Sequence, residues 1–247
     1  EEAKGQVGFI EGCVMQVMFG DTNESSAELL NRDSWDVITP RGQGCCGALY
    51  AHSGQLAKAR DCARRNIAAF ENEPLDAIII NAAGCGSTLV EYGELLKDDP
   101  AWAKRAEAFS AKVKDLVTWL DSSRFALSGS AAKVTYHDAC HLAHAQGITA
   151  EPRELVKAKS GGELVELAES DLCCGSAGSY NLTEPEMASR LQKRKVQNII
   201  DSGAEVVVTT NPGCLLQIQA GLRKAGAHHI RALHIADYLL EAGTADD

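Results

Sequence analysis

Cysteine is the residue type with the clearest chemical potential in this chain, because its nine copies are not spread evenly. Eight of them form two sets of the same design: one cysteine, then an adjacent pair followed by glycine, then a fourth cysteine. The first set is Cys13, Cys45, Cys46 and Cys85, and the second is Cys140, Cys173, Cys174 and Cys214. Four thiols per set are typical of a metal site or a thiol redox site.

Disulfide bonds do not explain this pattern. Disulfides persist mainly in secreted chains, and the N-terminal residues Glu1 and Glu2 do not open a signal peptide. The odd total of nine also leaves at least one thiol unpaired. We therefore expect reduced cysteines in a cytoplasmic chain. Because the chain does not begin with methionine, we also expect that a segment precedes Glu1.

The charge and size of the chain narrow its classes of partner. A net charge of −10 argues against nucleic acid, whose recognition needs a positive surface, and against binding to anionic membranes. No apolar run reaches the roughly 18 residues that a membrane-spanning helix needs, so no transmembrane segment is expected. A length of 247 residues, of which 45% are hydrophobic, is enough for two compact domains.

The two cysteine sets belong to an internal repeat. Laying the second half of the sequence over the first brings them into register, with offsets of 127, 128 and 129 residues. So small a drift over so long a unit indicates two versions of one domain-sized module. We predict a first module over residues 1–125, a second over residues 130–247, and a linker rich in serine and glycine at Asp121–Ala132.

Each module alternates between strand and helix patterns. Strands are predicted near 7–10, 36–39, 77–81, 133–136, 163–167 and 205–210. Helices are predicted near 25–30, 55–70, 87–96 and 183–200. The last of these begins with a capping box formed by Thr183 and Glu186 around Pro185. This alternation predicts an α/β fold of two pseudo-symmetric Rossmann-like modules, each with a parallel sheet.

The predicted fold gathers the cysteines. Right-handed crossovers place the carboxyl ends of all parallel strands at one edge of the sheet. Cys13, Cys85, Cys140 and Cys214 each follow closely on a predicted strand, and both adjacent pairs follow the second strand of their module. All eight thiols are therefore expected at the carboxyl edge, where open α/β sheets bind their ligands.

An iron–sulfur cluster fits this pattern better than zinc. Structural zinc prefers pairs spaced Cys-x₂₋₄-Cys, which are absent, while clusters take thiolates from dispersed positions, usually four for a four-iron cluster. Adjacent cysteines can reach two different irons. Gly47 and Gly175 let the backbone approach sulfide and donate N–H groups to it, and Gly84 and Gly213 lie in the corresponding loops. We expect these four glycines to line the cofactor site.

Several segments resemble the tandem CCG, or cysteine-rich, domains of the glycolate oxidase iron–sulfur subunit family. They are Gly44–Leu49, Tyr136–Leu142, Leu172–Gly178 and Asn181–Leu182. The wider family includes the B-type component of heterodisulfide reductase and the lactate-utilisation iron–sulfur proteins. The resemblance covers nearly the whole chain and implies one four-iron cluster per module, with the eight cysteines of the two sets as ligands.

The function that the resemblance implies is an electron relay. In this family a flavin-containing dehydrogenase subunit oxidises a 2-hydroxy acid such as glycolate, and clusters carry electrons towards a quinone or another acceptor. The chain is then expected to be the electron-transfer subunit of a flavin and iron–sulfur oxidoreductase. A ferredoxin-like domain or subunit is a further expected partner, and such partners would place the chain at the periphery of the inner membrane. Chemistry on the hydroxy acid is then expected to belong to the flavin-containing partner, so no catalytic residue is expected in this chain.

Two other functions stay open. The heterodisulfide reductase pattern ends each motif with Cys-x-x-Cys and holds a non-cubane cluster, whereas Thr88 and Gln217 stand three residues after Cys85 and Cys214 here. A catalytic disulfide or quinone reductase of that type is one alternative. A thiol-redox or zinc-binding regulatory protein, in which the adjacent cysteines form a disulfide switch, is the other.

Some residues near the motifs have two interpretations. The histidines that flank Cys140 are His137, His141 and His144. One of them can replace the missing cysteine as a ligand, although histidines in such loops more commonly form hydrogen bonds with backbone carbonyls. His52, after the first adjacent pair, has the same two interpretations. We interpret Cys62, which has no counterpart in the second module, as a core residue, and Lys193–Lys195 as a solvated helix face.

Overall fold

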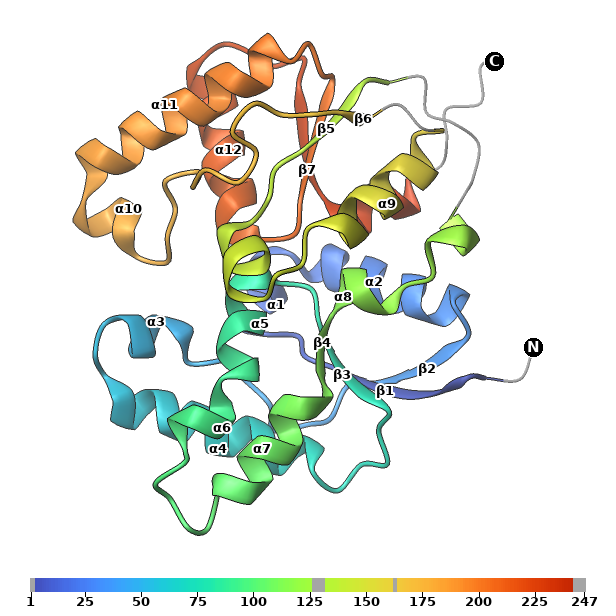
Figure 1. The fold of residues 1–247 in the computed structure, drawn as a ribbon, viewed down its shortest axis with the longest axis vertical. Coiled ribbons are helices and arrows are strands. Elements are labelled where there is room, and N and C mark those ends of the chain that lie inside the picture. Colours follow the sequence, from blue (N-terminus) through green and yellow to red (C-terminus); the bar gives the residue numbers. More distant parts are fainter. Residues whose placement is uncertain (1–2, 126–131, 162–163, 242–247) are drawn as a thin grey trace. The chain divides into compact units, whose positions relative to one another are not determined.

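The chain forms two compact units, Glu1–Leu120 and Asp121–Asp247. The computed structural model describes residues 3–125, 132–161 and 164–241 (Figure 1). Part of the predicted linker lies outside these residues, and its described beginning, Ser122–Phe125, is one turn of 3₁₀ helix. Glu163, the first residue of a predicted strand, also lies outside them. The two units are described separately below.

The first unit is built on a parallel sheet of four strands in the order β2-β1-β3-β4. The strands are β1 (Gly5–Phe9), β2 (Trp35–Ile38), β3 (Ala77–Ile80) and β4 (Val113–Asp115). Strand β3 consists of alanine and isoleucines that are all buried, as expected for a central strand covered on both faces. The helices are α1 (Val14–Met18), α2 (Gly20–Arg32), α3 (Ala48–His52), α4 (Leu56–Phe70), α5 (Ala83–Val90), α6 (Tyr92–Leu95), α7 (Ala103–Lys112) and α8 (Leu116–Trp119).

The second unit repeats this topology, with a parallel sheet in the order β6-β5-β7-β8. Its strands are β5 (Val134–Tyr136), β6 (Leu164–Val165), β7 (Val206–Thr209) and β8 (Arg231–His234). A π-helical turn, His141–Ala145, follows β5. The α-helices are α9 (Ala150–Lys159), α10 (Tyr180–Thr183), α11 (Pro185–Asp201), α12 (Pro212–Lys224) and α13 (Ile235–Leu240). The α/β class with two parallel sheets is confirmed.

Strand order decides which face each helix covers. The crossover from β1 to β2 runs in one direction across the sheet and the crossover from β2 to β3 runs back, so right-handed connections place their helices on opposite faces. Figure 1 accordingly shows α2 on one side of the first sheet and α4 with α7 on the other. In the second unit α9 lies on one side, and α11 and α12 lie on the other.

One prediction of local structure is wrong, and two strands were not predicted. The long helix begins at Pro185, after Glu184 at the N-cap position, without a capping side chain. Thr183 instead ends the preceding turn of helix, α10, where its hydroxyl donates to the carbonyl oxygen of Tyr180 at 3.4 Å. The fourth strands, β4 and β8, which pair with β3 and β7, were not predicted.

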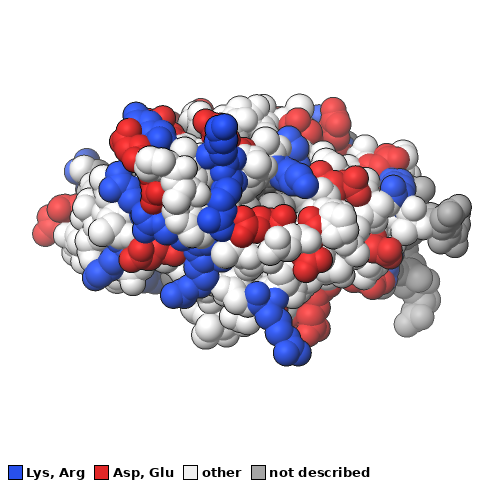
Figure 2. Space-filling view, turned by 90° about the horizontal axis from the view of Figure 1, so that it is seen from below, with Lys and Arg blue, Asp and Glu red and all other residues white. Residues whose placement is uncertain are grey.

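Charged side chains of both signs lie on the surface of the chain. Figure 2 shows acidic and basic side chains next to one another on one face. Surface ion pairs such as Arg105 with Glu71 at 2.7 Å contribute at most about 1 kcal/mol each. None of the helices in the described residues combines the length and the apolar character that crossing a membrane requires.

Asp115, at the end of β4, is a buried carboxylate in the first unit. Its Oδ1 accepts a hydrogen bond from the backbone N–H of Val117 at 3.2 Å and so caps α8. Its Oδ2 has no hydrogen-bond partner among the described residues. Burial raises the pKa of Asp115 to about 7. The folded chain therefore holds a proton on Asp115 at a pH where the unfolded chain has released it.

This raised pKa predicts a stability that falls as pH rises. From about pH 5 to about pH 8 the wild-type chain is expected to lose roughly 3 kcal/mol through Asp115. Asp115→Asn keeps the capping oxygen without ionising, and it is expected to remove that loss. Urea unfolding at both pH values measures the difference, with exposed Asp36→Asn as the control. Equal pH dependence in Asp115→Asn and the wild type would contradict the prediction.

Candidate metal centres

The predicted ligand cysteines lie just beyond the carboxyl ends of the strands. Cys13 is the N-cap residue of α1, directly after β1, and Cys85 lies in the first turn of α5, after β3. Cys140 precedes the π-helical turn after β5, and Cys214 lies in the first turn of α12. The adjacent pairs lie in loops after β2 and β6. Helix N-termini favour thiolates, because their backbone N–H groups carry partial positive charge.

In the first module the four thiols come together although they are spread over more than seventy residues. The Cys45 side chain shares hydrogen bonds with Cys13 and Cys46, and Cys46 also reaches Cys85. Cys46 is buried, while Cys45 and Cys85 are half-buried and Cys13 is exposed. The thiols therefore form one continuous group that extends from the core to the surface.

The second module repeats this arrangement. Cys173 shares hydrogen bonds with Cys140 and Cys174, and Cys174 also reaches Cys214. Cys174 and Cys214 are buried, and the other two are half-buried. The side-chain N–H of Asn211 donates to the sulfur of Cys214 at 3.5 Å. A compact set of four sulfur donors is thus present in each module.

Hydrogen bonds lower the pKa of the first cysteine of the adjacent pair in both modules, and in the second module a hydrogen bond from Cys174 also lowers the pKa of Cys214. Hydrogen bonds from Cys13 and then Cys46 keep the pKa of Cys45 well below its ordinary value, and hydrogen bonds from Cys140 and Cys174 do the same for the pKa of Cys173. The hydrogen bond to Cys45 in turn raises the pKa of Cys13. Thiolates are the form that binds metal.

The glycines after the adjacent pairs contact sulfur directly. The backbone N–H of Gly47 donates to Cys45 Sγ at 3.4 Å, and that of Gly175 donates to Cys173 Sγ at 3.3 Å. Both glycines have positive φ, 84° and 92°, which other residues adopt only with strain. These turns therefore aim an N–H group at the cysteine two residues earlier.

Gly84 and Gly213 lie in helices rather than in the predicted loops. Gly84 belongs to the first turn of α5, and Gly213 belongs to the first turn of α12. A Cβ atom on Gly213 would lie 2.8 Å from the hydroxyl of Ser176, in the loop that follows Cys174. This glycine therefore lets the start of α12 approach that loop closely.

Two residues that the sequence did not point to fix the first adjacent pair. The Asn66 side chain accepts from the N–H of Gly44 at 2.8 Å and donates to the carbonyl oxygen of Cys45 at 3.1 Å. The Tyr92 hydroxyl donates to the carbonyl oxygen of Cys46 at 2.7 Å. Asn66 and Tyr92 are buried and hydrogen-bonded to each other. The only feature of the sequence that could have pointed to Asn66 and Tyr92 is that each is a polar residue on the side of a helix that packs inwards.

Lys195 corrects one prediction. The run Lys193–Lys195 was expected to be a solvated face, but Lys195 is 0% exposed. It shares a buried stripe of α11 with Ala188, Gln192 and Ile199, at helical spacing. Its ammonium group donates to the carbonyl oxygens of Glu169 and Ser170, shortly before Cys173. This buried cation thus supports the loop of the second cysteine pair.

The other histidines and the ninth cysteine that the sequence analysis discussed lie in different surroundings. His144 is exposed and lies 3.4 Å from the carbonyl oxygen of Asp171, and His141 Nδ1 lies 3.6 Å from Cys140 Sγ. His52 ends α3 and is exposed. Cys62 was expected to be a core residue, but it is a half-buried residue of α4 that contacts Cys45.

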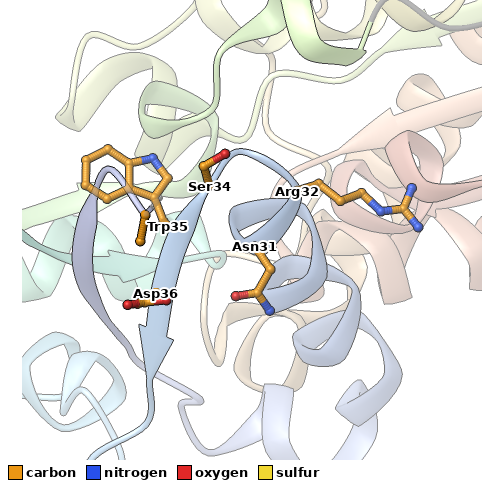
Figure 3. A pocket seen from close by; sticks show the side chains of 6 residues that line it. Asn31, Arg32, Ser34, Trp35 and Asp36 are labelled. Atoms are coloured by element: carbon orange, nitrogen blue, oxygen red, sulfur yellow. The ribbon is translucent and has the colours of Figure 1, made fainter. Parts of the chain in front are cut away.

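A shallow surface pocket of the first unit is not part of either thiol group. It is lined by Ala3, Asn31, Arg32, Ser34, Trp35 and Asp36 (Figure 3). These residues lie at the amino end of β2, whereas the cysteines lie beyond the carboxyl ends of the strands. The pocket therefore gives no evidence about the chemistry of the thiols.

Comparison with known proteins identifies relatives of the whole chain. Residues 7–90 and 134–219 match the profile of the family described as CCG, cysteine-rich domain. The chain is 44% identical over 244 residues to the probable glycolate oxidase iron–sulfur subunit of Bacillus subtilis, a match that covers 97% of this chain and 55% of that protein. It is 33% identical to lactate utilization protein A of an Exiguobacterium species, covering 93% of this chain and 94% of that protein. The chain thus spans about half of the first relative.

The fold also has a solved counterpart. A crystal structure of a hypothetical protein from Helicobacter pylori superposes with a TM-score of 0.68 at 13% sequence identity. The superposition covers 98% of this chain and 49% of that one. At this identity the likeness extends to the fold alone.

Proposed function

This chain belongs to the cysteine-rich, or CCG, domain family, and on that premise we propose that it holds iron–sulfur clusters and relays electrons within an oxidoreductase complex. The observation that carries the proposal is the convergence of four thiols in each module. Two relatives also support it, since one is named a glycolate oxidase iron–sulfur subunit and another is named a subunit of fumarate reductase (CoM/CoB), from Methanothermobacter marburgensis.

The donor sets fit such clusters. One four-iron cluster in each module would use the four thiols of that module, and a bound cluster supplies reversible one-electron transfer. The protein's part is to hold the thiolates, to donate N–H groups from Gly47 and Gly175 towards sulfur, and to let backbone approach at Gly84 and Gly213. The eight ligands in this proposal are Cys13, Cys45, Cys46, Cys85, Cys140, Cys173, Cys174 and Cys214.

The rest of the complex is part of the same proposal. A flavin-containing subunit would oxidise a 2-hydroxy acid and deliver electrons to this chain, which would pass them towards a quinone or another acceptor. A ferredoxin-like domain or subunit would be a further partner. In this proposal the chain is cytoplasmic and reaches the inner membrane through its partners. Catalysis on the hydroxy acid would belong to the flavin subunit.

Metal analysis of anaerobically purified protein tests this function. We expect about eight irons and about eight acid-labile sulfides per chain, that is, two four-iron clusters. Electron paramagnetic resonance before and after dithionite then separates cubane from non-cubane clusters. Zinc as the only metal, or no metal after anaerobic reconstitution, would overturn the proposal and favour a zinc-binding or thiol-redox regulator.

A further inference from the structure

His137, directly after β5, lies among the sulfur atoms of the second module. The residue is 0% exposed. A ring nitrogen of His137, Cys174 Sγ and Cys214 Sγ all lie within 4.8 Å of one another. Imidazole nitrogen and thiolate sulfur are both donors that iron and zinc accept in proteins. The second module therefore offers a buried nitrogen donor beside its four sulfur donors.

The hydrogen bonding of His137 decides which nitrogen is available. Its Nδ1 lies 3.1 Å from the carbonyl oxygen of Ser170, and a carbonyl oxygen only accepts, so Nδ1 carries the hydrogen. The lone pair is then on Nε2, which is buried and has no oxygen or nitrogen partner among the described residues, while the sulfur of Cys214 interacts with the same side chain. Metal-bound histidines characteristically donate their other N–H group to a backbone carbonyl or a carboxylate.

The carbonyl that orients His137 is itself held in place. Ser170 O also accepts from the ammonium group of Lys195 at 3.2 Å and from the backbone N–H of Asp138 at 3.1 Å. These contacts join the loop before Cys173 to the end of β5. The imidazole is thus oriented before any metal binds, which lowers the ordering cost of using it as a ligand.

Among the described residues of the first module, no such donor occupies the equivalent position. Ile10 precedes Cys13 by three residues, as His137 precedes Cys140. The two residues also occupy equivalent backbone positions, because the N–H of Ile10 donates to Ile79 O in β3 and that of His137 donates to Val208 O in β7, both at 2.9 Å. A buried isoleucine therefore stands where the second module has an imidazole.

We propose that His137 is a nitrogen ligand, through Nε2, to the metal centre of the second module. The inference rests on the proposed function, because it assigns a fifth donor to one of the two iron–sulfur clusters. It makes the two centres chemically different, one with four thiolates and one with four thiolates and an imidazole. Imidazole ligation of iron–sulfur clusters has a precedent in Rieske centres, where it raises the reduction potential.

Pulsed electron paramagnetic resonance of the reduced protein tests the ligand. The protein is prepared with natural histidine and with histidine labelled with ¹⁵N in the ring. We expect a nitrogen coupling of the size found for directly bound imidazole, and we expect it to change with the isotope. His137→Leu is expected to abolish this coupling while the thiols retain iron, and the exposed His144→Gln is expected to preserve it.

The outcomes separate this inference from the function on which it rests. If the chain contains iron and sulfide but the labelled wild-type protein shows no directly bound imidazole, His137 is not a ligand and the proposed function still stands. Retention of the coupling in His137→Leu also overturns the inference. If neither iron nor sulfide binds, the proposed function is wrong, and the inference about His137 falls with it. The isotope comparison uses wild-type protein, so the test does not depend on the folding of a variant.

Discussion

Replacing Cys46 by serine is expected to lower the iron and acid-labile sulfide bound per chain to about half of the wild-type amounts. Cys46 is 3% exposed and lies between Cys45 and Cys85 in the thiol group of the first module. A serine hydroxyl is a poor replacement for a buried thiolate, so the first centre is expected to be lost while the second keeps all its donors. Cys174→Ser is expected to do the same in the second module.

Cys62→Ser is the matched control. Cys62 contacts Cys45 and lies on α4 of the same module, but it is outside the repeated cysteine motif. We expect this variant to keep the full complement of iron and sulfide. Elemental analysis for iron and a colorimetric sulfide assay on anaerobic protein decide the matter. Full iron content in Cys46→Ser, or an equal loss in Cys62→Ser, would contradict the assignment of four cysteines per module.

Replacing Gly175 by alanine is expected to destabilise the second unit by roughly 3 kcal/mol or more. The residue has φ of 92°, where an alanine side chain alone costs about 1–2 kcal/mol. A Cβ atom would also lie 2.4 Å from the carbonyl oxygen of Ala188, which is backbone of α11 and cannot move independently. Either the helix or the cysteine loop must therefore shift, and the N–H contact with Cys173 is expected to be lost.

Gly147→Ala separates the two causes. Gly147 also has positive φ, 70°, but a Cβ atom there would meet nothing within 4 Å. In this variant the free energy of unfolding is expected to fall only by the cost of the positive φ, about 1 kcal/mol. Urea unfolding of both metal-free variants with reduced thiols gives the comparison. If the two variants lose the same free energy of unfolding within about 0.5 kcal/mol, the clash at Gly175 is relieved without cost and the prediction is wrong.

The arrangement of the thiols was predictable because it depends on few long-range details. Strand and helix alternation, the repeat offset and the right-handed crossover together place the residues after the strands at one edge. Cys13 and Cys85, which are 72 residues apart in sequence, therefore converge in the structure. By contrast, β4 and β8 escaped prediction, and the pairings with β3 and β7 that define them join segments more than twenty residues apart in sequence.

The burial of Lys195 and of Cys62 was predicted wrongly, because the burial of a single helical residue depends on the details of helix packing. Each is one residue on a helix, and a rotation of about 100° per residue decides whether it meets solvent, core or cysteine loop. The charge run around Lys195 favoured solvent when only composition was considered. Its spacing from Ala188, Gln192 and Ile199 was the sequence signal of its burial.

The sequence by itself determined the α/β class, the repeat and the edge at which eight cysteines gather, because these follow from periodicity and spacing along the chain. Only the tertiary structure decided which other groups meet the thiols. Asn66 and Tyr92 support the first pair, Lys195 supports the loop before the second, and His137 alone among the histidines flanking Cys140 lies buried between Cys174 and Cys214. These contacts join residues far apart in sequence, and helix packing against the sheet brings them together.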